Sequence, residues 1–454
     1  MVEEVLGIVL VFLVLKYPKS GIVHLNFHIY FCNVKLIRLI LNKEYINDLR
    51  KSNMKRISLN LLLIFFGGIA QAQVISTDST TNEPMNTAQN ILAGNGGKAI
   101  TVSGYGEVHF NQEFADTHRH NGKMDVHRVI MFLGYKFSNK TFFVTELEFE
   151  HVKELYVEQA FLQHSLNSNI NFRAGLMLIP MGIVNEYHEP TTFNGVERPN
   201  MDNKIIPTTW REIGAGFSGK FPSASLRYQL YVVNGLLSYD GVGKIGGNSG
   251  YRSGRQKGAN SIFTTPNITG KLDFYGLKGL KMGLSGYFGG TQSTAYDNLD
   301  LRENDAVLTA DSTVINMSMV GIDFRYQNKA FKARGQFIYS NNDNTEKYNA
   351  YTGRDLGSSF IGYYIEASYD VLTLINKDAK MELNIFGRYE NYDTHHSVIN
   401  MNRNLTYGRL DYTTGFGLKL ANGAVLKADY QQFINIDPTT DAKHQINLGL
   451  GVWF

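Results

Sequence analysis

The sequence is poor in three residue types that stabilise or interrupt folds: its 454 residues include one cysteine, two tryptophans and nine prolines. The cysteine is Cys32, so the region after residue 72 can form neither a disulfide nor a cysteine metal site. That region also has no run approaching the roughly 20 consecutive apolar residues that a transmembrane helix needs. A helical membrane protein is therefore excluded for the bulk of the chain, and strands are the remaining way to span a membrane.

Residues 54–72 have a basic start, an apolar stretch and an Ala-Gln-Ala ending, which is the layout of a secretory signal peptide cleaved after Ala72. We interpret Met54 as the true start and residues 1–53 as an upstream extension. The alternative is an anchor or second signal at residues 5–15. Residues 73–99 are polar and predict a flexible periplasmic lead-in, and residues 100–454 predict the main domain.

The excess of basic residues belongs to the first 72 residues, which hold nine Lys or Arg and four Asp or Glu. Without them, the 44 bases and 41 acids of the whole chain fall to 35 and 37, a formal charge of −2. Nothing in this balance indicates a nucleic-acid partner.

The chain is rich in glycine (44), phenylalanine (28) and tyrosine (26), and its end alternates in polarity. From His444 onward, Ile446, Leu448, Leu450, Val452 and Phe454 share one parity. A strand that is apolar on one face and ends in an aromatic residue is typical of the closing strand of an outer-membrane barrel, with its apolar face toward lipid. We expect Phe454 to be the C-terminal signal for the barrel-assembly machinery.

The same alternation recurs along the chain and predicts an all-β fold, a transmembrane antiparallel β-barrel of about 16 strands. The predicted strands are 101–110, 124–137, 141–150, 154–165, 169–177, 212–220, 225–234, 267–275, 279–290, 315–326, 330–340, 359–370, 380–390, 407–420, 423–434 and 443–454. Short turns alternate with mostly long, polar connections, as expected for short periplasmic turns and long external loops. No proline after residue 72 lies inside a predicted strand.

Ionisable residues within the strands mostly share the parity opposite the lipid face, which predicts a polar, water-filled lumen. The predicted pore-lining residues are Glu146, Glu148, Arg173, Arg227, Lys332, Arg334, Arg388, Arg409 and Lys427. Glu150 continues an acidic sector with Glu146 and Glu148. The alternative is that these charges pair across neighbouring strands without selecting any solute. Both signs are present, so the net field stays open.

The third loop, residues 178–211, contains four prolines and many charges, which predicts a stiff polar segment. If it folds into the barrel, it constricts the pore. The candidate constriction residues are Glu186, Glu189, Glu197, Arg198, Lys204 and Arg211. The alternative is a loop packed on the outer mouth or against another subunit. In the fourth loop, Arg252, Arg255 and Lys257 can gather anions at the entrance, or form an ordinary solvated surface.

Patterns for enzymes and cofactors are poor. His395 and His396 lack a third ligand at regular spacing, and neither a nucleophile elbow nor an HExxH pattern occurs. We therefore predict no catalytic residue, metal or cofactor.

Two segments of the third loop, 179–200 (IPMGIVNEYHEPTTFNGVERPN) and 206–212 (IPTTWRE), are similar to the corresponding region of the phosphate-selective porin O and P family. Segments 230–235 (LYVVNG) and 254–260 (GRQKGAN) also resemble that family. The resemblance covers essentially residues 100–454. It implies a sixteen-stranded porin, a homotrimer, that passes small solutes and in some members prefers phosphate.

These observations together predict a passive outer-membrane channel of a Gram-negative cell for small hydrophilic solutes, with anions such as phosphate as a hypothesis. Two other classes stay open. A plugged barrel would act as a scaffold or adhesion anchor and would not conduct. An outer-membrane barrel enzyme would need an acid/base or Ser/His pair at the rim.

Overall fold

The computed structural model describes residues 9–10, 30–31, 86–93, 99–115, 120–376 and 379–454. The chain divides into two units, Met1–Gln73 and Val74–Phe454. In the first unit, strand β1 (Val9–Leu10) pairs antiparallel with β2 (Tyr30–Phe31). The predicted signal peptide and the rest of the predicted extension lie outside the described residues.

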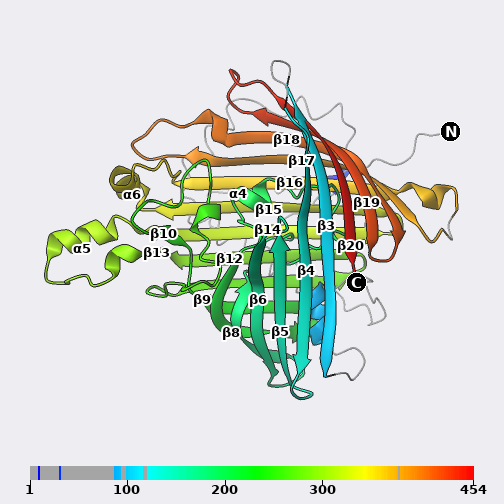
Figure 1. Ribbon diagram of the computed structural model, residues 1–454, viewed down its shortest axis with the longest axis horizontal. Helices are drawn as coiled ribbons and strands as arrows, with labels where there is room; N and C mark the ends of the chain where they lie inside the picture. Colours follow the sequence, from blue (N-terminus) through cyan, green and yellow to red (C-terminus); the bar gives the residue numbers. More distant parts are fainter. Residues whose placement is uncertain (1–8, 11–29, 32–85, 94–98, 116–119, 377–378) are drawn as a thin grey trace, which may run out of the picture. The chain divides into compact units, whose positions relative to one another are not determined.

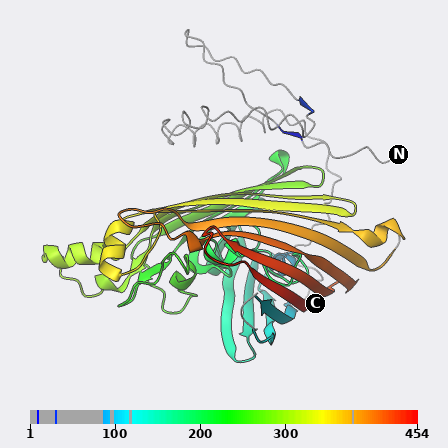
Figure 2. The ribbon, with the colours of Figure 1, turned by 90° about the horizontal axis from the view of Figure 1, so that it is seen from above.

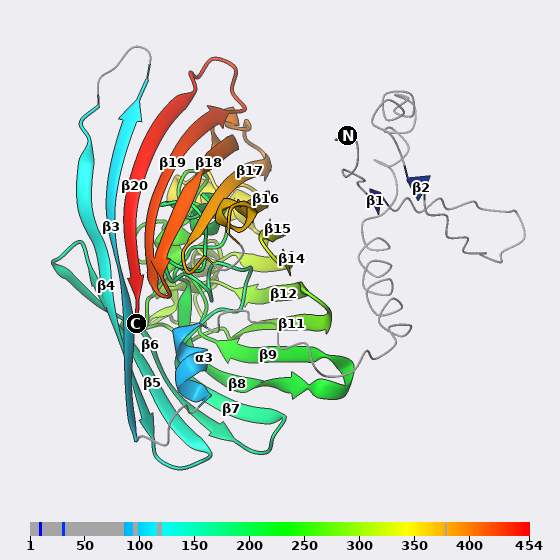
Figure 3. The ribbon, with the colours of Figure 1, turned by 90° about the vertical axis from the view of Figure 1, so that its right-hand side faces the viewer.

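In the second unit, sixteen strands form one closed antiparallel barrel (Figures 1 and 3). They are β3 (Ile100–Phe114), β4 (Lys123–Lys136), β5 (Thr141–Glu150), β6 (Glu154–Ser165), β7 (Ile170–Leu178), β8 (Arg211–Phe221), β9 (Leu226–Val233), β11 (Asn267–Leu277), β12 (Leu280–Gly290), β14 (Asn316–Asn328), β15 (Phe331–Asp343), β16 (Ser359–Asp370), β17 (Glu382–Ser397), β18 (Gly408–Ala421), β19 (Ala424–Asn435) and β20 (Lys443–Trp453). The predicted fold class and strand number are confirmed.

The wall follows the predicted two-residue period. In β14, Val320 and Ile322 are exposed on the outer face, whereas Met319 and Asp323 are buried inside. Strand β20 places Ile446, Leu448, Leu450 and Val452 on the outer face in the same way. An apolar outer band and a polar interior are what a lipid-embedded barrel requires.

β20 closes the barrel against β3 in antiparallel register, with Leu448 opposite Phe110 and Trp453 opposite Tyr105. The pairing continues to the last residue, because Phe454 exchanges two backbone hydrogen bonds of 2.9 Å with Gly104. The first and last strands of the barrel therefore leave no open edge.

The longer connections on the external side carry further elements. Helices α5 (Asn304–Asp311) and α6 (Thr345–Thr352) lie together at one end of the barrel (Figures 1 and 2). The short strands β10 (Leu237–Tyr239) and β13 (Gln292–Ser293) pair in parallel between two of these connections. Among the described residues, no helix has both the length and the apolar character needed to cross a membrane.

Short 3₁₀ helices shape several turns and loops. They are Pro222–Ala224, Arg252–Gly254, Thr294–Tyr296, Val371–Leu374 and Leu405–Tyr407.

The third loop, residues 179–210 between β7 and β8, lies inside the barrel and includes helix α4 (Met201–Lys204). Its side chains Ile179, Val184 and Ile206 are fully buried. A polar barrel interior thus encloses a small apolar core that belongs to the loop.

A second element inside the barrel is helix α3 (Thr87–Leu92), which the sequence analysis placed within a flexible lead-in. Ile91 packs against Gly134 on the inner face of β4. Gly134 lies near the end of β4 that leads into the short turn before β5. Asn86 caps the helix by accepting the Gln89 backbone N–H at 2.8 Å. Within the predicted lead-in, residues 87–92 therefore form a short helix (Figure 3).

Candidate functional site

The third loop is held against the barrel wall by carboxylates that accept its backbone N–H groups. Asp429 on β19 accepts from the Val196 N–H at 2.6 Å, and Glu390 on β17 accepts from the Met201 N–H at 2.7 Å. Charged acceptors make stronger hydrogen bonds than neutral ones. Polar wall residues thus fix the course of the loop over β17 to β19.

Lysines of the wall complete this support by donating to loop carbonyls. Lys427 on β19 donates to the Phe193 and Gly195 oxygens at 2.9 and 2.8 Å, and Lys271 on β11 donates to the Gly182 oxygen at 2.5 Å. A buried carbonyl without a donor would be costly, so these lysines stabilise the loop rather than face free solution.

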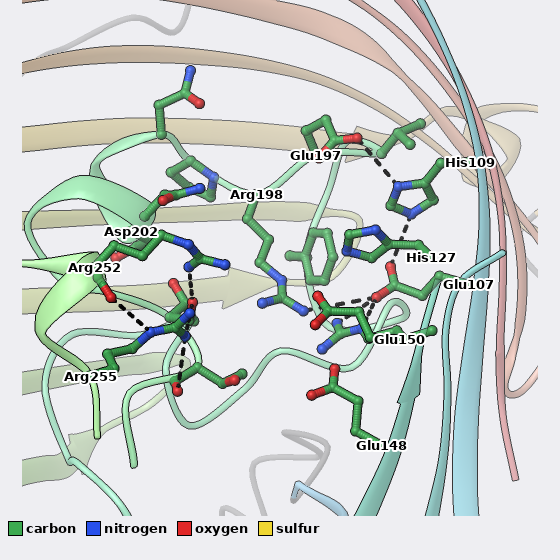
Figure 4. A pocket seen from close by; sticks show the side chains of 18 of the residues that line it. Glu107, His109, His127, Glu148, Glu150, Glu197, Arg198, Asp202, Arg252 and Arg255 are labelled. Atoms are coloured by element: carbon green, nitrogen blue, oxygen red, sulfur yellow. Dashed lines mark hydrogen bonds and ion pairs between the residues drawn. The ribbon is translucent and has the colours of Figure 1, made fainter. Parts of the chain in front are cut away.

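Because the loop lies against one side of the barrel, a cavity of about 280 Å³ is left beside β3 to β6. Its lining includes five acids and six bases. They are Glu107, Glu148, Glu150, Glu197 and Asp202, and Arg128, Arg198, Arg211, Arg252, Arg255 and Lys257. In Figure 4, Arg252 and Arg255 face Glu107, Glu148 and Glu150 across the space, and Asp202 is the acid on the side of the two arginines.

The acidic side is built by the wall. Glu107 on β3 forms an ion pair with Arg128 on β4, whose guanidinium also donates to the His188 oxygen of the third loop at 2.6 Å. Glu148 and Glu150 follow on β5 with inward parity. Arg198 extends between the two sides, 3.9 Å from the Glu107 carboxylate.

The basic side is built by the fourth loop, residues 234–266, which docks on the third. Arg255 donates to the Thr208 oxygen at 3.0 Å, and Arg252 donates to the same oxygen. Burial, followed by the neighbouring Arg252 and Arg211, lowers the pKa of Arg255, and burial with Arg255 and Arg211 lowers the pKa of Lys257. Burial is the main cause in both cases, and the neighbouring guanidinium groups add to it, so an anion bound here would favour the charged forms.

The six residues predicted for the constriction divide into two sets. Glu197, Arg198 and Arg211 line the cavity, although Arg211 begins strand β8. Glu186 and Glu189 do not line it, because Glu186 accepts from Gln229 at 2.7 Å and Glu189 accepts from Thr87 of α3 at 2.8 Å.

Lys204 also lies outside the cavity lining, since its amine donates to the Asn248 oxygen at 2.8 Å. All three predicted entrance residues, Arg252, Arg255 and Lys257, line the cavity. They therefore lie at the cavity itself and not only at the approach to it.

The nine predicted pore-lining residues all come from the wall, but the third loop covers several of them. Glu148 lines the cavity, whereas Glu146 is fully buried beside His188 of the loop. Arg334 and Arg388 both pair with Glu366, at 2.8 and 3.4 Å. Glu146, Arg334, Arg388 and Lys427 therefore contact the third loop or pair with Glu366, and they do not line this cavity.

The other four lie on the inner face outside this cavity. Arg173 donates to Gln163 at 2.8 Å, and Lys332 pairs with Glu382 at 3.1 Å. Arg227 and Arg409 are half-buried.

Sequence reasoning missed Glu107, His109, His127 and Arg128. Glu107 and His109 share the inner parity of the predicted strand 101–110, and that parity was the available signal. His127 and Arg128 are adjacent and cannot both face inward in a regular strand. A register shift opposite Glu107 and Val108 makes this possible, and the sequence pattern gives no sign of it.

Comparison with known proteins gives a relative of similar sequence and, separately, solved structures of similar fold. No family model matches the sequence. An uncharacterized protein of Aquifex aeolicus (strain VF5) is 31% identical over 319 residues, a match that covers 66% of this chain and 68% of that protein.

Two solved structures share the fold. The outer membrane channel DcaP of Acinetobacter baumannii has a TM-score of 0.51 at 11% identity and covers 78% of this chain and 97% of its own. The anion-selective porin from Comamonas acidovorans has a TM-score of 0.51 at 12% identity, and the match covers 78% of this chain and 99% of that porin. The fold is therefore that of an outer-membrane porin, and the resemblance to the phosphate-selective porin O and P family stays a prediction.

Proposed function

We propose that this chain, which belongs to one family with the uncharacterized Aquifex aeolicus protein, is an outer-membrane channel for passive diffusion of small hydrophilic solutes. The observation that carries the proposal is the charged cavity left between the third loop and the wall of a closed barrel. Charged lining keeps such a space wet, and solutes cross it unchanged, so the proposed activity is not enzymatic.

We further propose that the channel prefers anions, phosphate among them. Arg252, Arg255 and Lys257 form the basic side, and buried nitrogens of Arg198 and Arg211 have no hydrogen-bond partner within the described protein. Guanidinium groups match the geometry of phosphate and carboxylate oxygens. The opposing acids limit the preference, so we expect moderate rather than strict selectivity.

The remaining parts of the proposal concern the surroundings of the barrel. The apolar outer face fits outer-membrane lipid, export uses the predicted signal peptide, Phe454 is read by the barrel-assembly machinery, and the channel assembles as a homotrimer. Native mass spectrometry of the detergent-solubilised protein tests the trimer.

The central test is single-channel recording of the purified protein in a planar bilayer. We expect discrete conductance steps and, under a salt gradient, a reversal potential of anionic sign in chloride and in phosphate. A cation-signed potential would overturn the anion preference alone. Absence of conductance would overturn the channel.

A plugged barrel is the second candidate, because two elements occupy the lumen. Helix α3 lies beneath the third loop: Thr87 donates to Glu189 at 2.8 Å, and the Asn86 side chain donates to the Glu186 oxygen at 2.9 Å. The channel and the plug predict different basal currents, and α3 offers a way to change them.

Displacing α3 is expected to raise conductance about two- to threefold, because conductance follows the open cross-section of a pore. Gly134→Leu does this without removing chain, since even a Cβ at Gly134 would come within 2.2 Å of Ile91. Single-channel current in the planar bilayer is the readout.

Gly387→Leu is the matched control, since a Cβ at that strand glycine has no atom within 4 Å. We expect its conductance to equal that of the unaltered protein. An unchanged current in Gly134→Leu, with the fold intact by circular dichroism, would show that α3 does not limit flow.

A further inference from the structure

Three potential metal ligands meet at the external end of the wall, beside the cavity. Asp125 and His127 lie at the start of β4, and His151 lies in the turn between β5 and β6. The Asp125 carboxylate is 2.5 Å from His151 Nδ1 and 3.7 Å from His127 Nδ1. One ligand atom from each residue lies within 4.8 Å of the others. Tetrahedral ligands at about 2.0–2.2 Å from a zinc-like ion are about 3.3–3.6 Å apart, so the 3.7 Å separation fits, whereas the 2.5 Å contact is a hydrogen bond that must lengthen by about 1 Å to admit the ion.

The backbone fixes this approach. The connection between β5 and β6 is the shortest on the external side. Its residues His151 and Val152 have φ values of 52° and 67°, so both adopt the left-handed backbone conformation although neither is glycine. The His151 N–H donates to the His127 oxygen at 3.2 Å, which holds the turn over β4. The His127 ring in turn stacks on the His109 ring, with 4.6 Å between the ring centroids. The three side chains are therefore held near one another in the absence of a ligand.

The surroundings favour a cation and leave it access. Glu150 lies 3.9 Å from His151 Nε2, and Glu107 and Glu197 flank His109, each at 3.3 Å. The side chains of Asp125, His127 and His151 are 33%, 30% and 42% exposed. An ion can reach them from solution, and water can complete its coordination.

A second cluster, Glu146, Glu158 and His188, has similar residue types but a different environment. All three residues are buried, and Arg211 lies 3.4 Å from the Glu158 carboxylate. A cation there would meet a guanidinium and would be closed off from solvent by the burial of all three side chains. That cluster is better explained as a charge-balanced network that holds the third loop.

We propose that Asp125, His127 and His151 bind one divalent transition-metal cation of the zinc class at the external mouth of the barrel. Two imidazole nitrogens and one carboxylate oxygen suit Zn²⁺, Co²⁺, Ni²⁺ or Cu²⁺, whereas Mg²⁺ and Ca²⁺ prefer all-oxygen sites. The sequence analysis predicted no metal, because the three ligands lie on two separate strand ends and only the register of β4 with β5 brings them together. The site does not depend on whether the barrel conducts.

Cobalt titration of the full chain, purified in detergent without a histidine tag, tests the proposal. We expect one equivalent of Co²⁺ to give visible d–d absorption that Zn²⁺ abolishes and a large excess of Mg²⁺ does not. His127→Gln, His151→Gln and Asp125→Asn are each expected to weaken Co²⁺ binding at least about tenfold. These side chains are half-exposed, so the variants should fold normally.

His396→Gln is the control, an exposed histidine on β17 that belongs to neither cluster, and its affinity for Co²⁺ should not change. Three results would overturn the proposal: no saturable Co²⁺ absorption, affinity retained in all three ligand variants, or competition by Mg²⁺ as effective as that by Zn²⁺. Conductance is not part of the readout, so a failure here is separate from a failure of the channel.

Discussion

Replacement of Arg252, Arg255 and Lys257 with glutamate is expected to reverse the selectivity of the channel from anions to cations. The three substitutions remove the basic side of the cavity and leave Glu107, Glu148 and Glu150 facing further acids. We expect the anion-to-cation permeability ratio to fall by about tenfold or more, which corresponds to about 1.4 kcal/mol. The reversal potential in a planar bilayer under a potassium chloride gradient measures this ratio.

A matched control carries the same change of charge outside the cavity. Lys153, Arg302 and Lys347 are exposed residues of external connections, and their triple replacement with glutamate should leave the sign of the potential unchanged. The neutral glutamine variant of the basic side should give an intermediate ratio. Equal shifts in the two glutamate triples would mean that total external charge, and not the cavity, sets selectivity.

Glu366→Gln is expected to lower the free energy of unfolding by about 3–5 kcal/mol. Glu366 is buried on β16 between Arg334 and Arg388, at 2.8 and 3.4 Å, and also accepts from Asn194 of the third loop at 2.9 Å. A neutral amide of the same shape removes the carboxylate that pairs directly with both buried guanidinium groups. Urea unfolding in phospholipid vesicles, followed by tryptophan fluorescence, gives the difference.

Glu303→Gln serves as the comparison, because Glu303 is exposed in an external connection and its replacement should change stability by less than about 0.5 kcal/mol. Loss of stability in Glu366→Gln should be accompanied by noisier single-channel currents, since the third loop loses a wall contact. Equal stability of the two variants would refute the view that this buried pair of arginines depends on Glu366.

The wall was predictable from sequence because alternation is a local signal that each strand carries by itself. The sixteen predicted strands correspond to those observed, and three of them, 141–150, 154–165 and 359–370, have the observed bounds. The largest difference is β17, which was predicted to end at residue 390 and continues to Ser397. Its extension lies against external loops, where side chains on both faces are covered and alternation fades.

The contents of the lumen were less predictable, because they depend on contacts between distant segments. Glu189 is a charged residue of the third loop, as expected at a constriction, but its carboxylate accepts a hydrogen bond from Thr87, about 100 positions earlier in the sequence. Lys427 has the parity of a pore-lining residue but is covered by loop carbonyls. Residue type and parity place a side chain on the inner face, and only the course of the third loop decides whether solute can reach it.

The seam between β3 and β20 also has a consequence for the order of assembly. Every other neighbouring pair of barrel strands is consecutive along the barrel sequence, whereas the seam joins Tyr105 to Trp453. Contacts of such long sequence separation form late, because the intervening chain must be ordered first. Hairpins of consecutive strands can therefore form one after another. Until β3 and β20 pair with each other, the backbone N–H and C=O groups on the free edge of each strand have no partner. The final step of biogenesis is then the joining of these two strands, and an agent that pairs transiently with β20 would keep the growing sheet from associating with other chains.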